Sequence, residues 1–301
     1  MSHFRVMMVL VALSVAWVGG VVAQTDWDAV EIETIHIAGN VYMLVGSGGN
    51  IGVLVGEDGP IVIDDQYAPL TEKIRAAVQS IDSAEVRFVI NTHWHGDHTG
   101  GNENFSEAGA LILAHDNVYN RMSVDQFMEA FNREVPAAPE EALPVITFSH
   151  EVTLRFNGED LNVFHVENAH TDGDAIVHFT KANVFHMGDT FFNGRYPFID
   201  VGSNGGINGV IGAASAVLEK VNSETKIIPG HGPLASASDL VLYRDMLVAV
   251  RDRIQAMMDE GMSEDEVLAS NPTSEFDETF GNNSERFVRF SYQSLAGARE
   301  R

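Results

Sequence analysis

The sequence predicts an α+β fold in which two mixed β-sheets pack face to face and helices cover their outer faces. Strand-like apolar runs occur in two groups, and each group is followed by residues with the apolar spacing of a helix. No linker rich in Pro, Gly or Ser separates the two groups. A chain of 301 residues is long enough to bury a sizeable core. We therefore expect residues 24–301 to form a single domain.

The first group of expected strands lies in the N-terminal half. Residues 32–45 alternate between apolar and polar side chains, and the turn dipeptide Gly39-Asn40 divides them. Apolar residues recur at helical spacing over residues 70–81, Asp116–Met122 predicts a short helix, and three prolines in residues 134–145 predict a loop. Short apolar runs predict further strands at Ile51–Val55, Ile61–Ile63, Val86–Ile90 and Leu111–Leu113.

The second group has the same character. Its expected strands are Val152–Phe156, Leu161–Val166, Ala175–Phe179, Val184–Met187 and Lys226–Ile228. Helices are expected near Val210–Val221, at 239–260 and at 284–296. The glycines of residues 202–209 are not followed by Lys-Ser or Lys-Thr, so they predict a flexible loop and not a phosphate-binding loop.

The N-terminus has the pattern of an export signal. Arg5 precedes the apolar run Val6–Trp17, and the small residues of Val21-Val22-Ala23 predict cleavage before Gln24. We therefore expect residues 1–23 to be a signal peptide, the mature protein to be secreted or periplasmic, and no stable membrane anchor. An uncleaved anchor is the alternative, although the apolar segment is at the lower length limit for crossing a bilayer.

The composition restricts partners and metal ligands. Asp and Glu outnumber Lys and Arg by 43 to 18, which gives a formal charge of -25. Such a charge repels phosphate backbones, so we expect a small-molecule substrate and no nucleic acid. The chain has no cysteine, so any metal must be held by His, Asp or Glu. The oligomeric state is left open.

Six consecutive residues, His93-Trp94-His95-Gly96-Asp97-His98, offer four metal-ligand side chains directly after an expected strand. His93 and His95 can point to the same side of an extended segment, and Gly96 permits a tight turn. Three imidazoles this close repel one another when charged, whereas a metal ion uses their neutral lone pairs. Further ligand-type residues lie just past the ends of later expected strands, at His170, Asp189 and His231.

The run His93-x-His95-x-Asp97-His98, followed by His170, Asp189 and Pro229-Gly230-His231-Gly232, resembles the metallo-β-lactamase superfamily. The resemblance covers nearly the whole mature chain. It implies a four-layer αββα sandwich with a dinuclear zinc site at one edge, and so two Zn²⁺ per chain. It assigns His93, His95 and His170 to the first zinc, Asp97, His98 and His231 to the second, and Asp189 to the bridging position.

Two positions separate this chain from the best-known zinc β-lactamases of that family. Asp189 stands where those enzymes have Cys or no metal ligand. An Asp at this position is similar to glyoxalase II-like and lactonase-like members and to some lactamase-like relatives. Phe192 stands where many lactamases have a Lys that binds the substrate carboxylate. Arg195 is a possible substitute for that Lys, because it is close in sequence.

The resemblance implies a zinc-dependent hydrolase in which a metal-bound hydroxide attacks the carbonyl of a small substrate, with Asp97 as the catalytic residue that orients the hydroxide. A β-lactam is the leading substrate. The alternative is a thioester, lactone or other ester, as in glyoxalase II-like or lactonase-like enzymes. Di-iron redox members usually replace the second His of the run with Glu, whereas His95 is present. The acidic charge opposes a nuclease, and the large ligand set opposes a closed structural zinc site.

Two aspartates are expected behind the ligands. Asp64, after the strand Ile61–Ile63, resembles the family's aspartate that orients a ligand imidazole; a turn-capping role is the alternative, with Asp65 as a rival. Asp174 is expected to support the turn that carries His170, or to form an ordinary Asx-turn. The remaining strand histidines are expected to be structural, at His115, His165, His178 and His186.

Overall fold

The first sheet contains seven strands in the spatial order β1-β2-β3-β4-β5-β6-β9. In this computed structural model, which describes residues 25–281 and 284–300, strands β1 to β4 pair antiparallel, and β4, β5, β6 and β9 pair parallel. The bounds are β1 Glu33–Ala38, β2 Val41–Val45, β3 Ile51–Leu54, β4 Ile61–Ile63, β5 Phe88–Ile90, β6 Leu111–His115 and β9 Ile146–Phe148.

The second sheet contains six strands in the order β10-β11-β12-β13-β14-β15. All neighbours are antiparallel except β13 and β14, which are parallel. The bounds are β10 Glu151–Phe156, β11 Glu159–His165, β12 Ala175–Phe179, β13 Val184–His186, β14 Lys226–Ile228 and β15 Ala235–Ser236.

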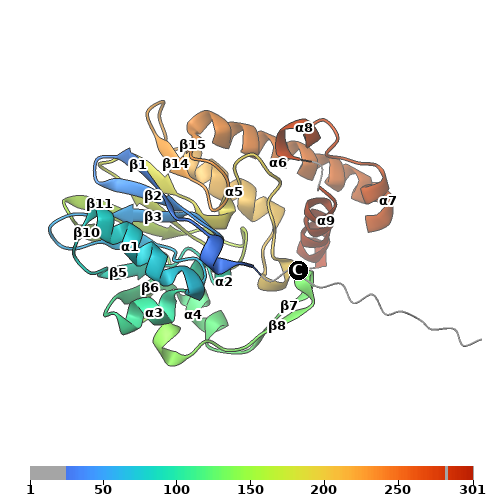
Figure 1. Cartoon of the computed structure of the whole chain (residues 1–301). Helices are drawn as coiled ribbons and strands as arrows, with labels where there is room; N and C mark the ends of the chain where they lie inside the picture. Colours follow the sequence, from blue (N-terminus) through green and yellow to red (C-terminus); the bar gives the residue numbers. More distant parts are fainter. Residues whose placement is uncertain (1–24, 282–283, 301) are drawn as a thin grey trace, which may run out of the picture.

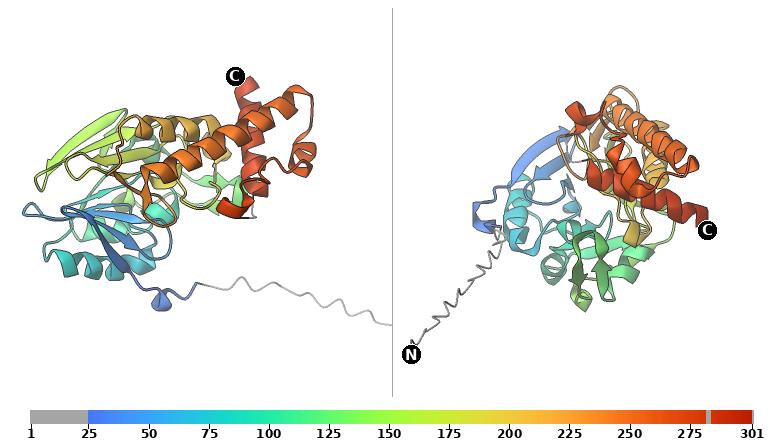
Figure 2. Two further views of the ribbon diagram at one scale, coloured as in Figure 1. Left: turned by 90° about the horizontal axis from the view of Figure 1, so that it is seen from above. Right: turned by 90° about the vertical axis from the view of Figure 1, so that its right-hand side faces the viewer.

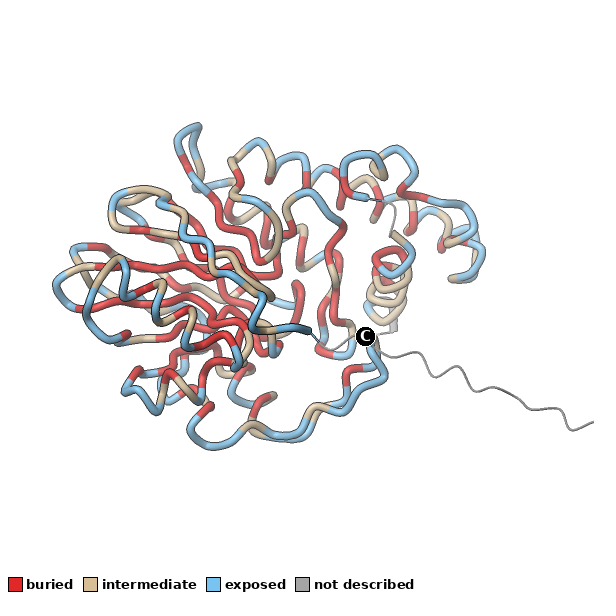
Figure 3. Tube along the Cα trace, in the orientation of Figure 1, coloured by how far each residue is buried: buried red, intermediate tan, exposed pale blue. Residues whose placement is uncertain are grey.

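The two sheets stack on each other, and helices cover both outer faces (Figures 1 and 2). A buried cluster with Met43, Ile63 and Ile90 from the first sheet and Val177 and Phe179 from the second fills the space between them. Buried residues therefore follow the central strands (Figure 3). The helix bounds are α1 Thr71–Ile81, α2 Gly96–Thr99, α3 Asn102–Glu107, α4 Asp116–Met122, α5 Ile207–Leu218, α6 Ala237–Asp259, α7 Glu264–Ala269, α8 Asp277–Phe280 and α9 Glu285–Glu300.

Each outer helix buries one apolar stripe on its sheet. In α1, Ile74 and Val78 are four residues apart, and both pack on the outer face of the first sheet. Tyr243 and Leu247 of α6 are likewise four apart and pack on the second. Ser236 is the N-cap residue of α6, and its side chain forms a capping box with Asp239. The αββα sandwich expected from the sequence is confirmed.

The expected loop over residues 134–145 is confirmed from residue 136 onward, apart from a 3-10 turn at Glu140–Ala142, and is wrong for residues 134 and 135. Part of that segment belongs to a hairpin of β7, Gln126–Met128, and β8, Arg133–Val135. Its side chains Phe127 and Phe131 are 53% and 48% exposed, so the strands lack the apolar alternation that reveals a half-buried strand in the sequence. The hairpin reaches from α4 toward α9 (Figure 1).

The expected signal peptide, residues 1–23, lies outside the described residues. Within residues 25–281 and 284–300, no helix combines the length and apolar character that crossing a bilayer requires.

Candidate metal centre

The loops that carry the seven expected ligands leave the strands at one edge of the sandwich. His93, His95, Asp97 and His98 follow β5, whereas His170 lies in the loop between β11 and β12. Asp189 and His231 follow β13 and β14, which are parallel and so end at the same edge. Two backbone hydrogen bonds join the sheets there, from Ala175 N to Thr92 O at 2.8 Å and from Asn50 N to Gly230 O at 2.7 Å.

The structure brings all seven side chains together in three overlapping groups, each with its ligand atoms within 4.8 Å of one another. One group is His93, His95 and His170, and another is Asp97, His98 and His231. These groups match the two ligand sets that the family resemblance implies. The third group, His93, His98 and Asp189, joins them.

Asp189 lies between the two ligand sets. Its Oδ2 is 3.6 Å from Nε2 of His170 and 3.9 Å from Nε2 of His93. Its Oδ1 is 3.1 Å from Nε2 of His98 and 3.4 Å from Nε2 of His231. Each carboxylate oxygen therefore faces one set, as a bridging ligand requires.

Hydrogen bonds to the outer nitrogens fix the tautomers of the first set. Nε2 of His95 donates to Asp200 Oδ2 at 2.9 Å, and Nδ1 of His170 donates to the backbone oxygen of Phe198 at 2.8 Å. The remaining nitrogens, Nδ1 of His95 and Nε2 of His170, then carry lone pairs and face each other at 2.9 Å. Two facing lone pairs repel, so this arrangement fits a cation between them.

His93 and His98 are arranged in the same way. Nδ1 of His98 donates to Asp64 at 2.7 Å, and Nδ1 of His93 lies 3.1 Å from the Thr92 hydroxyl, which itself donates to Asp64. Nε2 of both imidazoles and Oδ1 of Asp189 are buried without a hydrogen-bond partner. Buried orphan acceptors that converge on one point are costly in an apolar interior, whereas a metal ion satisfies them. The residues present therefore fit divalent metal ions.

Burial keeps two ligands of the first set, His93 and His170, neutral. Burial is the main cause that lowers the pKa of His170 to about 4, and it lowers the pKa of His93 well below its usual range. Neutral imidazole is the form that binds a metal ion. The side chains of Asp97 and His231 are instead 24% and 19% exposed. Although burial opposes ionisation of Asp97, His98 and His231 lower its pKa to about 2.

Two glycines let loops approach the ligands closely. A Cβ on Gly230 would lie 2.1 Å from Oδ1 of Asp189, and a Cβ on Gly49 would lie 2.1 Å from Cε1 of His98. Both distances are far below van der Waals contact, so any side chain at either position must displace a candidate ligand.

The two expected supporting aspartates occupy different places. Asp64 is fully buried and contacts His98 directly, whereas its rival Asp65 accepts a hydrogen bond from Gly101 N. Asp174 binds the backbone and hydroxyl of Thr171 at 2.8 and 2.7 Å and does not hydrogen-bond the His170 ring. Burial raises the pKa of Asp174 to about 8. Asp174 thus braces the turn that carries His170.

Sequence reasoning missed Asp200. This buried side chain accepts hydrogen bonds from His95 at 2.9 Å and from the Ser203 hydroxyl at 2.6 Å, and Ser203 in turn accepts from the Trp94 indole at 3.1 Å. Asp200 lies 105 residues from His95 in the chain, and no local spacing signals the contact.

A cavity of about 290 Å³ opens onto the candidate ligands. Its walls include Asp97, Asp189 and His231, together with residues of the β7–β8 hairpin and of α9. Phe192 lines it and stacks on His231 with ring centroids 5.2 Å apart. Arg195 does not line it: this arginine is exposed after the turn at Gly194, so the structure does not bring it to the site. The arginines that do line the cavity are Arg133 and Arg286.

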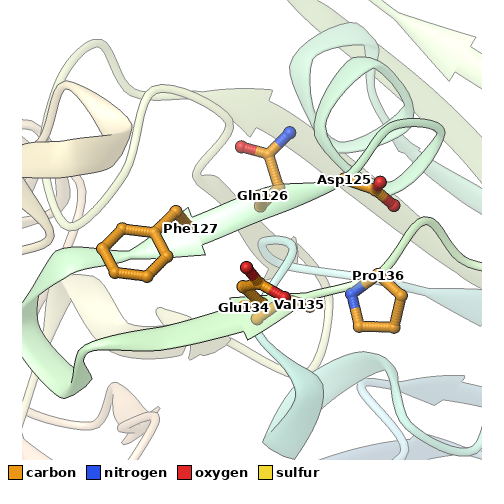
Figure 4. Close-up of a pocket in the computed structure, with 6 residues that line it drawn as sticks. All are labelled: Asp125, Gln126, Phe127, Glu134, Val135 and Pro136. Carbon is orange, nitrogen blue, oxygen red and sulfur yellow. The ribbon is translucent and has the colours of Figure 1, made fainter.

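A second, larger hollow of about 570 Å³ lies along the hairpin (Figure 4). Phe127 and Gln126 of β7 and Glu134 and Val135 of β8 line it. None of the candidate ligands contributes to this hollow. It is therefore not the place where we expect chemistry.

The four histidines expected to be structural lie outside the three ligand groups. His115 and His165 stack with ring centroids 3.8 Å apart, and His178 stacks on Phe185 at 3.9 Å. Nε2 of the buried His186 bonds the backbone oxygen of Asn50 at 3.0 Å.

The fold and this ligand geometry define a metallo-hydrolase. Residues 44–240 match the model of the metallo-beta-lactamase superfamily, and the chain belongs to that superfamily.

Individual relatives are distant. The chain is 26% identical over 183 residues to the 2,4-dinitroanisole O-demethylase subunit alpha of Nocardioides sp., covering 59% of this chain and 51% of that protein. It is 25% identical over 190 residues to metallo-beta-lactamase type 2 of Bacteroides fragilis, covering 60% and 70%. It is 26% identical over 184 residues to hydroxyacylglutathione hydrolase of Polaromonas sp., covering 59% and 60%. The chain thus spans about half the length of the first of these relatives.

Solved structures share the fold. A metallo-beta-lactamase from Pontibacter korlensis superposes with a TM-score of 0.58 at 17% identity, covering 72% of this chain and 99% of that one. An inverting sec-alkylsulfatase from Pseudomonas sp. superposes with a TM-score of 0.64 at 17% identity, covering 88% and 50%.

Proposed function

We propose that this protein is a zinc-dependent hydrolase that acts on the carbonyl group of a small substrate and holds two zinc ions per chain. The observation that carries the proposal is the clustering of seven residues with nitrogen and oxygen donors, four of which line one open cavity. His93, His95 and His170 would hold one ion, Asp97, His98 and His231 the other, and Asp189 both. Bound zinc ions polarise a carbonyl oxygen and activate water at neutral pH.

Residues of the cavity wall have separate roles in orienting water and excluding it. Asp97 is partly exposed to the cavity and, with its pKa lowered to about 2, stays a carboxylate at neutral pH. It can therefore orient an attacking water by accepting a hydrogen bond from it. Oδ2 of Asp97 lies 3.4 Å from Nε2 of His231, so the carboxylate is held in one position. Phe192, stacked on His231, excludes water from one side of the cavity.

A β-lactam is the first candidate substrate. The similarity to the Bacteroides fragilis metallo-beta-lactamase extends over 70% of that enzyme. We also propose that the mature chain is exported after residue 23, which would place it where β-lactams reach a cell. Since Phe192 stands where a carboxylate-binding Lys is expected in many lactamases, we expect slow or narrow β-lactam hydrolysis.

A thioester, lactone or other ester is the second candidate. It is favoured by Asp189, because a carboxylate at the bridging position resembles glyoxalase II-like and lactonase-like enzymes. The match to hydroxyacylglutathione hydrolase, over 60% of that protein, supports the same reading.

The test is a comparison of initial rates of zinc-loaded protein with a chromogenic cephalosporin, lactones, thioesters and phosphodiesters, each with and without EDTA. We expect one of the three acyl classes to be hydrolysed and EDTA to abolish the rate. Hydrolysis of a lactone or thioester without any β-lactam would select the second candidate. Hydrolysis of phosphodiesters alone would overturn the proposal.

A further inference from the structure

Two arginines from distant parts of the chain meet at the candidate active site. Arg133 comes from β8 of the hairpin and Arg286 from the first turn of α9, and both line the cavity that contains Asp97 and His231. In a chain with 18 basic and 43 acidic residues, two arginines on the wall of one small cavity, beside the carboxylates of Asp97 and Asp189, are a local concentration of positive charge.

Neither guanidinium is neutralised by a carboxylate. Among residues 25–281 and 284–300, no ion pair within 4.0 Å involves Arg133 or Arg286. Arg289, three residues further along α9, pairs with both Glu264 and Glu285. Arg289 therefore has acidic partners. The two arginines that line the cavity have no carboxylate partner among the described residues, so their charge can act on a bound ligand.

Aromatic contacts hold Arg286 against the hairpin. Its guanidinium carbon lies 5.1 Å from the ring centroid of Phe131, at the tip between β7 and β8. Phe131 packs on Phe198 with centroids 5.4 Å apart, and Phe198 stacks on the candidate ligand His95 at 5.9 Å. Consecutive aromatic contacts therefore connect Arg286 of α9, the hairpin tip and the loop that carries His95.

Arg133 has a weak contact of a different kind. Its Nη2 lies 3.4 Å from the sulfur of Met128, which is a poor acceptor. A guanidinium with this environment gains most from a carboxylate or another oxyanion, which accepts charge-assisted hydrogen bonds. Phe131, Phe192 and Phe198 on the same walls offer an apolar surface beside the charge.

We propose that Arg133 and Arg286 bind an anionic group of the substrate, so that the enzyme selects acyl compounds carrying a carboxylate next to an apolar body over neutral ones. The inference rests on the proposed hydrolase function, because it names the substrate class of that same cavity. Arg133 and Arg286 are specificity-determining residues in this scheme and take no part in bond breaking.

The test compares Arg133→Gln, Arg286→Gln and the double variant with wild type on matched substrates. Each acyl compound that wild type hydrolyses is supplied as the free carboxylate and as its methyl ester. We expect KM for the carboxylate to rise about ten-fold in each single variant, with kcat changed less than about three-fold. KM for the methyl ester should be unchanged. The matched control is Arg155→Gln, an arginine with 77% of its side chain exposed on β10, which removes the same charge elsewhere.

Salt provides a second readout. Because both arginines are exposed, raising ionic strength should increase KM for the carboxylate in wild type and much less in the double variant. Equal KM values for carboxylate and methyl ester, or equal losses on both in the arginine variants, would overturn the inference while leaving hydrolysis intact.

If wild type hydrolyses none of the acyl compounds, the proposed function fails and the arginines are judged by binding alone. The probes are then 3-phenylpropanoate and its neutral amide, measured by titration calorimetry on zinc-loaded protein. Binding of the carboxylate that weakens about ten-fold in either arginine variant, but not in Arg155→Gln, would support the anion site. Unchanged binding in the variants would overturn it.

Discussion

Oδ2 of Asp64 accepts a hydrogen bond of 2.7 Å from Nδ1 of His98, and both side chains are fully buried. Asp64 also accepts from the backbone and hydroxyl of Thr92 at 2.7 and 2.8 Å. Its backbone has φ 63°, in the left-handed region that non-glycine residues seldom occupy. A strained residue with three donors around its carboxylate is held in place by the fold, and the consequence is that Nε2 of His98 faces the metal site as a lone pair.

Replacing Asp64 with Ala should weaken metal binding about ten- to a hundred-fold, because His98 loses the partner that fixes its tautomer. The measurement is zinc affinity by competition with a chromogenic chelator. The exposed Asp28→Ala is the matched control, since it removes the same charge away from the site. Equal affinities in wild type and Asp64→Ala would mean that Asp64 serves only the backbone turn.

Gly230→Ala should displace Asp189, because the added Cβ would lie 2.1 Å from its Oδ1. We expect bound zinc to fall from about two ions per chain toward one or none, with activity lost in parallel. The control is Gly212→Ala in α5, where an added Cβ meets nothing within 4 Å and Ala favours the helix. Metal analysis after gel filtration gives the stoichiometry, and a Gly230→Ala protein that retains both ions would contradict the bridging role of Asp189.

The motif could be predicted from the sequence because its chemistry is local. His93 to His98 are contiguous, and each later candidate ligand follows a short apolar strand, so strand prediction alone places them at a sheet edge. The two sheets and their outer helices could also be predicted, because apolar periodicity within each strand and helix is a local signal. The cavity wall proposed to bind the substrate could not be predicted from the sequence. Arg133 and Arg286 are 153 positions apart in the chain (286 minus 133), and only the tertiary structure brings them to the same cavity. The hairpin that carries Arg133 is exposed and leaves no periodic pattern.

Metal removal should lower thermal stability. Without a cation, the lone pairs of His95 and His170 face each other at 2.9 Å and Asp189 Oδ1 is buried without a partner. A ligand at 100 times its Kd stabilises a protein by about 2.7 kcal/mol, which is roughly 4–5 °C in Tm for a chain of this size. Differential scanning fluorimetry of EDTA-treated protein, retitrated with zinc, measures the shift. An unchanged Tm on zinc addition would remove the basis for the metal centre.

Other divalent metals should partly replace zinc. The candidate ligands are imidazoles and carboxylates without a thiolate, and such donors accept a wider range of divalent ions. We expect Co²⁺, Mn²⁺ or Fe²⁺ to restore a fraction of the activity of apo-protein, and also part of its Tm. Recovery with zinc alone, across the whole series, would show that the site is more selective than its donor set implies.

Asp200 should support metal binding by the first ligand set, as Asp64 does for the second, because each carboxylate orients one ligand imidazole. Its carboxylate orients His95 at 2.9 Å, and Ser203 and Trp94 extend the chain of hydrogen bonds behind it. Burial opposes ionisation of Asp200, but the hydrogen bond from His95 lowers its pKa to about 2, so the group is a carboxylate throughout the neutral range. Two variants separate the charge of Asp200 from its hydrogen bond, because Asp200→Asn keeps an acceptor for His95 without the charge, whereas Asp200→Ala removes both. We therefore expect a graded loss of zinc affinity, several-fold for Asn and about ten- to a hundred-fold for Ala. The Tm of each apo-protein separates this effect from unfolding, and Asp252→Ala, on the exposed face of α6, controls for lost charge. If Asn and Ala reduce affinity equally, the charge of Asp200 is what holds His95; if neither reduces it, the contact seen in the structure has no part in metal binding.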